Sequence, residues 1–493
     1  MAGPRAEGAR DVLDTPAAGP AAIRGGSLRV IGYAVGVCAS VASAALLFRH
    51  LGVQDTGRYV TVLSIVTLTG GLTDAGLTNI GIREWAVRRG RERDALLRSL
   101  LALRIALSVG AGAVATAFAA VAGYPRAMVL GTALASFALL AQNVQSAFTV
   151  PMLAELRLAA ATALDLLRQI LTAFLIVALV VAGAELLPFF AVAIAAGLIV
   201  LVVTAFLLRG RVPLRPDFRS ELWLPLLRDT LPYAAATAVA AAYFRVAVVL
   251  VSLIASAEET GYFGASYRVI EVLIVVPQLL VGAAFPIFAR AAQDDRERFA
   301  YATRRMAEAG LVFGGWLAVA LALAAPFAIE VVAGDDFEPA ASVLRIQALA
   351  LVASFAAAVW GYALLGLRRH RELLLINLAA LAWIGSLTAL LTATHGAQGA
   401  AAATASGELL LALAGAAVLA RTSTGFELPW TTLAKTLVAA CAAVALALLL
   451  EASPPLEAAG GTLVYFAVLL ALRGIPDELL QELRRPLARR RAA

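Results

Sequence analysis

The sequence has few of the residues from which metal centres and redox sites are built. Its 493 residues include two cysteines, Cys38 and Cys441, and three histidines that lie far apart. Both cysteines fall inside apolar runs, which excludes a disulfide framework and a Cys/His metal cluster. Lysine occurs once, at Lys435, so nearly all of the basic residues are arginines. We therefore expect neither a metal ion nor a cofactor.

Charge is also scarce. Only 15% of the residues are charged and 61% are hydrophobic, with a mean hydropathy of +0.86. These values exceed the apolar content of an ordinary soluble domain and predict an integral membrane protein. A net charge of +7 would suit a nucleic-acid partner if the basic residues shared one soluble face. Here they are scattered between apolar runs, so no nucleic-acid partner is expected.

The apolar residues form runs long enough to cross a bilayer, which takes about 20 residues per helix. The runs cover residues 28–48, 59–81, 99–122, 127–150, 160–182, 187–208, 231–255, 264–288, 308–332, 342–366, 373–394, 399–420, 433–450 and 458–472. The sequence therefore predicts an all-α polytopic membrane protein with about 14 transmembrane helices.

The arginines predict the orientation. They are concentrated after the even-numbered runs, in residues 83–98, 209–228, 290–305 and 368–371. The opposite connections carry only Arg49, Arg58 and Arg126. Because basic residues remain preferentially on the cytoplasmic side, both termini are predicted to be cytoplasmic and the protein to reside in the cell membrane.

One polar phrase occurs twice. QDTGRY covers residues 54–59, and EETGYF covers residues 258–263, 204 positions later. Each follows the first apolar run of a six-run block, which predicts duplicated lobes related by a pseudo-two-fold axis along the membrane normal. Two further helices follow the second lobe. A purely local alternative is an interhelical turn, in which glycine supplies unusual dihedrals and threonine caps the next helix.

These patterns divide the chain into four parts. Residues 1–23 are predicted to be a disordered cytoplasmic lead, and residues 24–215 and 216–425 the two six-helix lobes. Residues 426–493 should contain two additional helices and a basic cytoplasmic tail.

Several ionisable residues lie inside the runs, where each costs about 2.5 to 3.5 kcal/mol unless it is paired or functional. Depth along the predicted helices aligns Arg245 with Glu271, and Asp74 with Arg104. Asp165 and Arg168, three residues apart, share one helical face. Such pairs either hold helices in register or act as cavity charges or ion-coupling groups.

The second lobe has an excess of arginine at one depth. Arg245 and Arg268 face one acid, Glu271, and this surplus suits a phosphate or diphosphate, which arginine binds bidentately. Arg345 is a further candidate, with snorkelling to lipid headgroups as the alternative.

Other polar residues in the runs are also candidates. Glu408 has no basic neighbour at its depth, which suits a proton- or cation-coupling group or a protonated, hydrogen-bonded glutamic acid. Polar residues that line a cavity or join helices are Gln142, Asn143, Gln145 and Asn377.

Five stretches carry a family resemblance. They are LGVQDTGRYVTVLSIVTLTGGLTDAGLTNIGIREWA, RPDFRSELWLPLLRDTLPYAAATAVAAAYFRVAVVL, EETGYFGASYRVIEVLIVVPQLLVGAAFPIFAR, GDDFEPAASVLRIQALAL and GAQGAAAATASGELL. Spread over roughly residues 28–425, this pattern resembles the polysaccharide flippases of the multidrug/oligosaccharidyl-lipid/polysaccharide exporter (MOP) superfamily, although no single motif is diagnostic.

The resemblance implies a flippase rather than an enzyme. Such a protein moves an undecaprenyl-diphosphate-linked oligosaccharide to the outer leaflet by alternating access, for cell-surface polysaccharide synthesis. Its expected partners are that lipid, the membrane lipids, and glycosyltransferases or a polymerase of the same pathway. Arg245 and Arg268 fall where family members carry cavity cations. Ala247 stands where many members have an acid, which leaves Glu271 or Glu408 for ion coupling.

Two other functions compete with this interpretation. A cation-coupled drug antiporter of the same superfamily would need an acidic, aromatic cavity, whereas the candidates here are arginines. A membrane glycosyltransferase or polysaccharide polymerase would carry its catalytic residues on a sizeable outer loop, whereas the predicted outer connections are short. The adjacent acids Asp335 and Asp336 lie in one of those connections. ATP hydrolysis is not expected because no GxxxxGK[ST] motif occurs.

Overall fold

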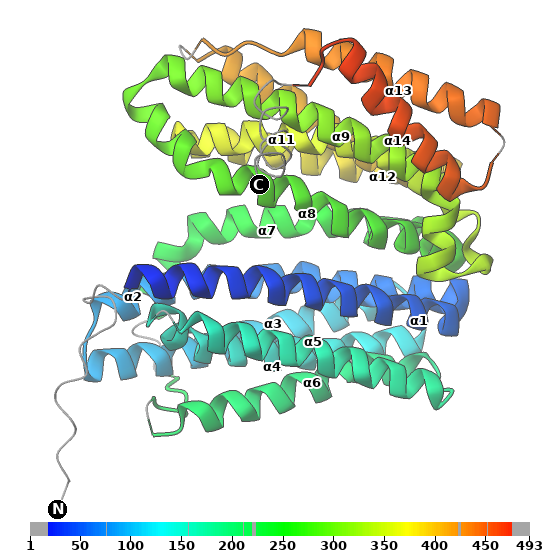
Figure 1. Ribbon diagram of the computed structural model, residues 1–493. Coiled ribbons are helices and arrows are strands. Elements are labelled where there is room, and N and C mark those ends of the chain that lie inside the picture. The colour runs from blue at the N-terminus through cyan, green and yellow to red at the C-terminus, as the bar shows by residue number, and fades with distance from the viewer. Residues whose placement is uncertain are drawn as a thin grey trace, which may run out of the picture. The chain divides into compact units, whose positions relative to one another are not determined.

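A computed structural model describes residues 18–74, 76–155, 157–210, 212–218, 223–422, 425–450 and 452–475. All regular elements in these ranges are helical, fourteen α-helices and the short 3₁₀ helix η3 (Asp335–Phe337) (Figure 1). Eleven helices are long and apolar enough to cross a membrane. The prediction of an all-α polytopic membrane protein is thereby confirmed.

The chain forms two compact units, Met1–Arg245 and Val246–Ala493. The first contains α1 (Ala18–Asp74), α2 (Leu77–Val87), α3 (Arg91–Val121), α4 (Arg126–Ala154), α5 (Leu158–Val181), α6 (Leu186–Leu208) and most of α7 (Trp223–Ile254). The second contains α8 (Ala257–Asp294), α9 (Arg296–Ala333), η3, α10 (Ala340–Ala348), α11 (Ala350–Gly366), α12 (His370–Ala420), α13 (Trp430–Leu450) and α14 (Pro454–Ala471).

The predicted runs extend at most one residue beyond the ends of these helices. Runs 59–81 and 342–366 are each divided between two consecutive helices, and α1 and α12 each contain residues of two runs. Helix α1 breaks at Gly52 (φ 70°, ψ −179°), and α12 breaks at Gly396 (φ 54°, ψ −137°). In Figure 1, α1 crosses the first unit and returns to end beside α2. The arms of α12 are antiparallel neighbours, because Trp383 Nε1 donates a hydrogen bond to Ser406 Oγ at 3.0 Å. Both breaks are hairpins made by glycine at positive φ.

The local explanation of the repeated phrase is wrong. Its glycines, Gly57 and Gly261, lie inside helices and are absent from the described residues with positive φ. Before the first copy of the phrase, helix α1 reverses at Gly52. Before the second copy, helix α8 is capped by Ser256, whose Oγ accepts a hydrogen bond from Glu259 N. The phrase therefore forms the opening turns of the returning helix in both units.

Each unit is assembled around its own core. In the first, α4 packs against α3 and α6, and α1 packs against α5. One hydrophobic cluster there contains Leu77, Leu97, Leu101 and Phe148. In the second, α11 packs against α8, α9 and α12 around Phe288, Val359 and Trp360. The contacts named here are all between helices of the same unit.

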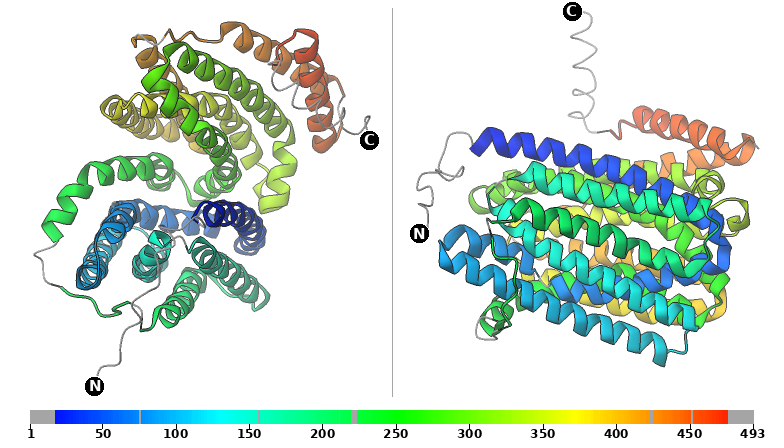
Figure 2. Two further views of the ribbon diagram at one scale, coloured as in Figure 1. Left: turned by 60° about the vertical axis from the view of Figure 1, so that its left-hand side comes forward. Right: turned by 90° about the horizontal axis from the view of Figure 1, so that it is seen from below.

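The last two helices belong to the second unit. Tyr465 of α14 donates its hydroxyl to Val312 O of α9 at 2.8 Å, and Trp316 of α9 donates to Thr462 Oγ1 at 3.2 Å. Figure 2 shows α13 and α14 beside α9 at the edge of this unit. The predicted boundaries at residues 23, 215 and 425, and the pseudo-two-fold axis, stay predictions.

In each unit, a hydrogen bond between a side chain and the backbone joins two of the turns at which the chain reverses direction. In the first unit His50 Nε2 donates to Ala184 O at 2.7 Å, joining the end of the first arm of α1 to the α5–α6 turn. In the second, Glu259 Oε2 accepts from Ala397 N at 2.6 Å, joining the start of α8 to the reversal of α12. The connection is equivalent, although the chemical groups differ.

Gly396→Ala should lower the free energy of unfolding by at least about 1 kcal/mol, because an L side chain is strained at its positive φ and would meet the Glu259 carboxylate. The check is thermal unfolding of the detergent-purified protein. Gly385→Ala is the control, since Gly385 lies in the first arm of α12 with open space around it. Equal unfolding midpoints for the two variants would contradict this account of the reversal.

Candidate functional site

A polar network lies at the centre of the first unit. Arg104 of α3 is 1% exposed, and its guanidinium donates to Thr78 Oγ1 at 2.7 Å, to Asn143 O at 3.1 Å and to Ser146 Oγ. The amide of Asn143 donates to Thr73 Oγ1 at 2.9 Å and to Ser108 Oγ at 2.8 Å. The network thus joins α3 and α4 to both sides of the α1–α2 break.

The break itself requires this support. Helix α1 ends at Asp74, and Gly76 adopts the left-handed conformation (φ 73°, ψ 8°) before α2 begins. The side chain of Asp74 lies outside the described residues, so its predicted pairing with Arg104 stays a prediction. Thr73 and Thr78 flank the break, and each is held by a buried donor. Buried polar groups without partners are costly, so the network fixes the geometry of this junction.

The polar residues of α4 are divided between two environments. Asn143 and Gln145 are buried, whereas Gln142 is exposed. Asn143 joins helices, as one of the two sequence interpretations proposed. The Nε2 atom of Gln145 has no hydrogen-bond partner within the described part of the chain. Gln142 is therefore the member of this trio with an exposed side chain.

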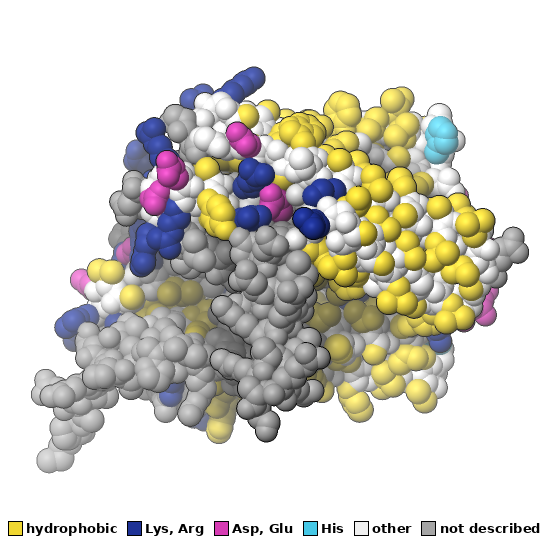
Figure 3. Space-filling model, turned by 45° about the horizontal axis from the view of Figure 1, so that its top comes forward, with side chains coloured by type: hydrophobic (Ala, Val, Ile, Leu, Met, Phe, Trp, Pro, Cys, Tyr) yellow, Lys and Arg dark blue, Asp and Glu magenta, His cyan; other side chains and the backbone are white. Residues whose placement is uncertain are grey.

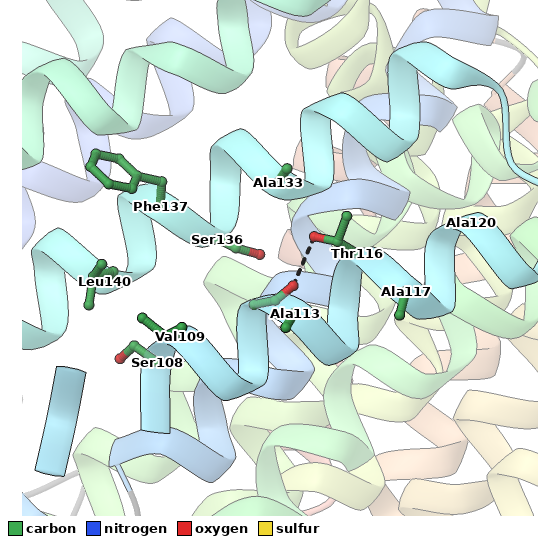
Figure 4. A pocket seen from close by; sticks show the side chains of 11 residues that line it. Ser108, Val109, Ala113, Thr116, Ala117, Ala120, Ala133, Ser136, Phe137 and Leu140 are labelled. Atoms are coloured by element: carbon green, nitrogen blue, oxygen red, sulfur yellow. Dashed lines mark hydrogen bonds between the residues drawn. The ribbon is translucent and has the colours of Figure 1, made fainter. Parts of the chain in front are cut away.

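A groove runs between α3 and α4, with a volume of about 470 Å³ (Figure 4). Its walls include Val109, Ala113 and Phe137, and the side chains that line it are uncharged. Ser108 lies at this groove and accepts from Asn143, so the groove reaches the polar network. Its apolar walls do not fit an ionic substrate group.

The candidate charges of the second unit lie on three helices. In α8, Arg268 Nη1 and Glu271 Oε2 form an ion pair of 2.9 Å, one turn apart, with both side chains partly buried. Arg345, in the last turn of α10, is exposed, and Glu408 of α12 is buried. Glu271 is thus paired with an arginine three residues away on the same helix.

Arg245 closes the first unit. It lies in α7 with a half-buried side chain. Arg245 and Glu271 are predicted to lie at the same depth in the membrane. They belong to different units, so this stays a prediction. The pairing predicted within α5 is found, because Arg168 Nη2 and Asp165 Oδ1 lie 3.7 Å apart.

Sequence reasoning missed a buried acid near the start of α9. Glu308 accepts from Arg304 at 3.0 Å and from Arg305 at 2.8 Å. Its spacing of three and four residues from these arginines was a detectable helical signal. In Figure 3 charged side chains gather toward one side of the visible face, and hydrophobic side chains cover much of the described surface on the other side. This distribution is typical of a membrane protein with a charged surface at the bilayer boundary.

The eleven apolar helices long enough to cross a bilayer define a multi-pass membrane protein. A family model described as polysaccharide biosynthesis protein matches residues 27–292, more than half of the 493 residues. The chain belongs to this family. The resemblance found in the sequence is therefore confirmed.

Solved structures show the same fold. The chain is similar to the lipid II flippase MurJ in an inward closed conformation, with 12% identity, a TM-score of 0.75, and coverage of 90% of this chain and 99% of that one. It is also similar to an inward-facing multidrug resistance MATE family transporter of the MOP superfamily, with 14% identity, a TM-score of 0.59, and coverage of 76% and 92%.

A MOP superfamily transporter from Pyrococcus furiosus gives 15% identity and a TM-score of 0.54, with coverage of 80% of this chain and 93% of that one. No curated protein matches by sequence. The chain shares its fold with these three solved structures.

Replacing Arg104 by alanine should destabilise the first unit by about 1 to 3 kcal/mol or more, because buried acceptors lose their donor. Thermal unfolding in detergent measures this loss. The matched control is Arg83→Ala, since the Arg83 side chain is 64% exposed and pairs with Glu84 at the surface. An unchanged melting temperature for the Arg104 variant would show that the network does not hold the break.

Proposed function

We propose that the chain is a flippase that moves a polyprenyl-diphosphate-linked oligosaccharide across the cytoplasmic membrane by alternating access, for cell-surface polysaccharide synthesis. The observation that carries this proposal is the family match over residues 27–292. The fold shared with a lipid II flippase over 90% of the chain supports a lipid-linked substrate.

The charges support an anionic substrate. Arg245 and Arg268 are the residues proposed to bind the diphosphate, and Arg345, Gln142 and Asn143 are the further candidates. Arg268 lies partly exposed in α8, with Glu271 one turn away. This acid orients the guanidinium, a group whose fork of N–H donors matches the oxygens of a phosphate. Glu271 and Glu408 are the proposed ion-coupling acids, with Asp74 and Arg104 as a possible second pair.

The remaining assignments follow from this function. Both termini are proposed to be cytoplasmic, with the arginine-rich connections on that side. The substrate is supplied by glycosyltransferases and its saccharide is polymerised after transport, so these enzymes are the proposed pathway partners. The chain itself catalyses no covalent reaction in this scheme.

A cation-coupled antiporter is the second candidate, because MATE transporters share the fold. The two functions require opposite charges at the substrate site. A drug cation would be repelled by Arg245 and Arg268, whereas a diphosphate would be bound by them. The partly exposed arginine of α8 therefore favours the flippase.

Arg268→Ala and Arg245→Ala should each slow transbilayer movement of a prenyl-diphosphate oligosaccharide in proteoliposomes by roughly tenfold, the factor expected when one charge-assisted hydrogen bond is lost. Lysine at either position should retain part of the activity because the charge remains. The readout is the fraction of fluorescent saccharide that becomes accessible to an outside lectin. Arg83→Ala is the control for a surface arginine.

The same vesicles discriminate the alternatives. Arg345→Ala should slow movement if this side chain meets the substrate, and should leave it unchanged if it snorkels to headgroups. Counterflow of an organic cation, unaffected by the arginine variants and without lipid movement, would replace the flippase by the antiporter.

A further inference from the structure

Helix α5 has two unlike faces. Its exposed apolar residues are Ile170, Phe174, Val177 and Val181, spaced four, three and four apart, with Phe174 65% exposed. This spacing forms one stripe along the helix, as expected of a surface against lipid. Asp165 and Arg168 fall on the opposite side, because neither continues the stripe at helical spacing.

The opposite face is directed toward the interior of the first unit. Leu164, on one side of Arg168, is buried in the core. Gln169, on the other side, lies so close to Gly36 of α1 that a side chain at Gly36 would overlap its amide. Asp165 and Arg168 lie between these two contacts. The α1 and core contacts therefore fix the rotation of α5 with its charges away from the lipid stripe.

The charged residues are accessible although they face inward. The Asp165 side chain is 54% exposed and that of Arg168 is 30% exposed. A carboxylate on an inward face of a membrane-spanning helix is tolerated where that face lines water. The exposure of Asp165 and Arg168 on this side of α5 fits a wall that lines water.

Arg168 lies deep in this wall. It is the eleventh of the 24 residues of α5, about 15 Å from the first residue at 1.5 Å per residue. Its contact with Asp165 is 3.7 Å, longer than a charge-assisted hydrogen bond of about 2.8 Å. Its Nε has no hydrogen-bond partner in the described chain. The guanidinium therefore has N–H groups beyond the one that faces Asp165, about halfway along a helix long enough to cross a bilayer.

We propose that Arg168 is a further substrate-binding residue, contributed by the first unit, that binds an oxyanion of the transported molecule. This inference rests on the proposed function, since it assumes an anionic lipid-linked saccharide. The oxyanion is either the diphosphate or the carboxylate of an acidic sugar, because both accept the same forked pair of N–H donors. Asp165 holds Arg168 when no substrate is bound.

The first test is accessibility to a membrane-impermeant thiol reagent. With Cys38 and Cys441 replaced by serine, single cysteines are placed at Asp165 and at Arg168, and at Ile170 and Phe174 as lipid-facing controls from the same helix. Asp165→Cys and Arg168→Cys should react rapidly in proteoliposomes, and the two controls should not. Equal rates at all four positions, or no reaction at Asp165 and Arg168, would overturn the aqueous cavity.

The second test is protection of Asp165→Cys by a ligand. Farnesyl diphosphate and an oligouronate are compared with farnesol and a neutral oligosaccharide, so that the two sources of oxyanion are separated. At least one anionic probe should slow the labelling, and adding Arg168→Gln should raise its half-protecting concentration roughly tenfold. Arg168→Lys should raise it less. Protection by the neutral probes, or protection that survives Arg168→Gln, would overturn the assignment.

Failure of this inference and failure of the proposed function give different results. Labelling and protection require no transport, so they can succeed in a protein that does not move lipid. Lipid movement that is unaffected by Arg168→Gln, with no protection by either anion, would remove Arg168 from the site and leave the flippase intact.

Discussion

The cost of placing charge in hydrocarbon determines how this structure uses its few ionisable residues. An unpaired charge at the centre of a bilayer costs about 2.5 to 3.5 kcal/mol on insertion scales. Within the described chain, Arg104 is buried among hydrogen-bond acceptors, and Arg268 is paired with Glu271. Asp165 and Arg168 lie on the side of α5 away from its apolar stripe. The helices are consequently oriented by their charges as well as by their apolar faces.

The same constraint explains why the helices were predictable. Backbone groups in lipid must be satisfied within the segment, so each long apolar run had to become a helix. The reversals at Gly52 and Gly396 interrupt α1 and α12 between runs that the sequence had already separated. The pair formed by Asp165 and Arg168 was equally predictable, because a spacing of three residues places two side chains on the same face of a helix.

Contacts between distant residues were not predictable. Glu259 meets Ala397, 138 positions away, through a backbone N–H that leaves no mark in the sequence. Asn143 was identified as a polar residue within a run, but its two acceptors, Thr73 and Ser108, come from different helices. Glu271 pairs with Arg268, three residues away on the same helix, whereas its level with Arg245, counted by depth, stays a prediction. Depth alone does not specify the direction of a side chain around the helix.

The attachment of α13 and α14 to α9 has a consequence for biogenesis. Gly315 of α9 leaves a furrow that is filled by Thr436 and Tyr465, and Trp430, the first residue of α13, follows the end of α9 by 97 residues. The ribosome therefore releases α9 into the membrane well before its covering helices exist. Until then this surface of α9 lacks the two side chains that cover Gly315 in the complete chain. The second unit matures only when the final spans have been synthesised.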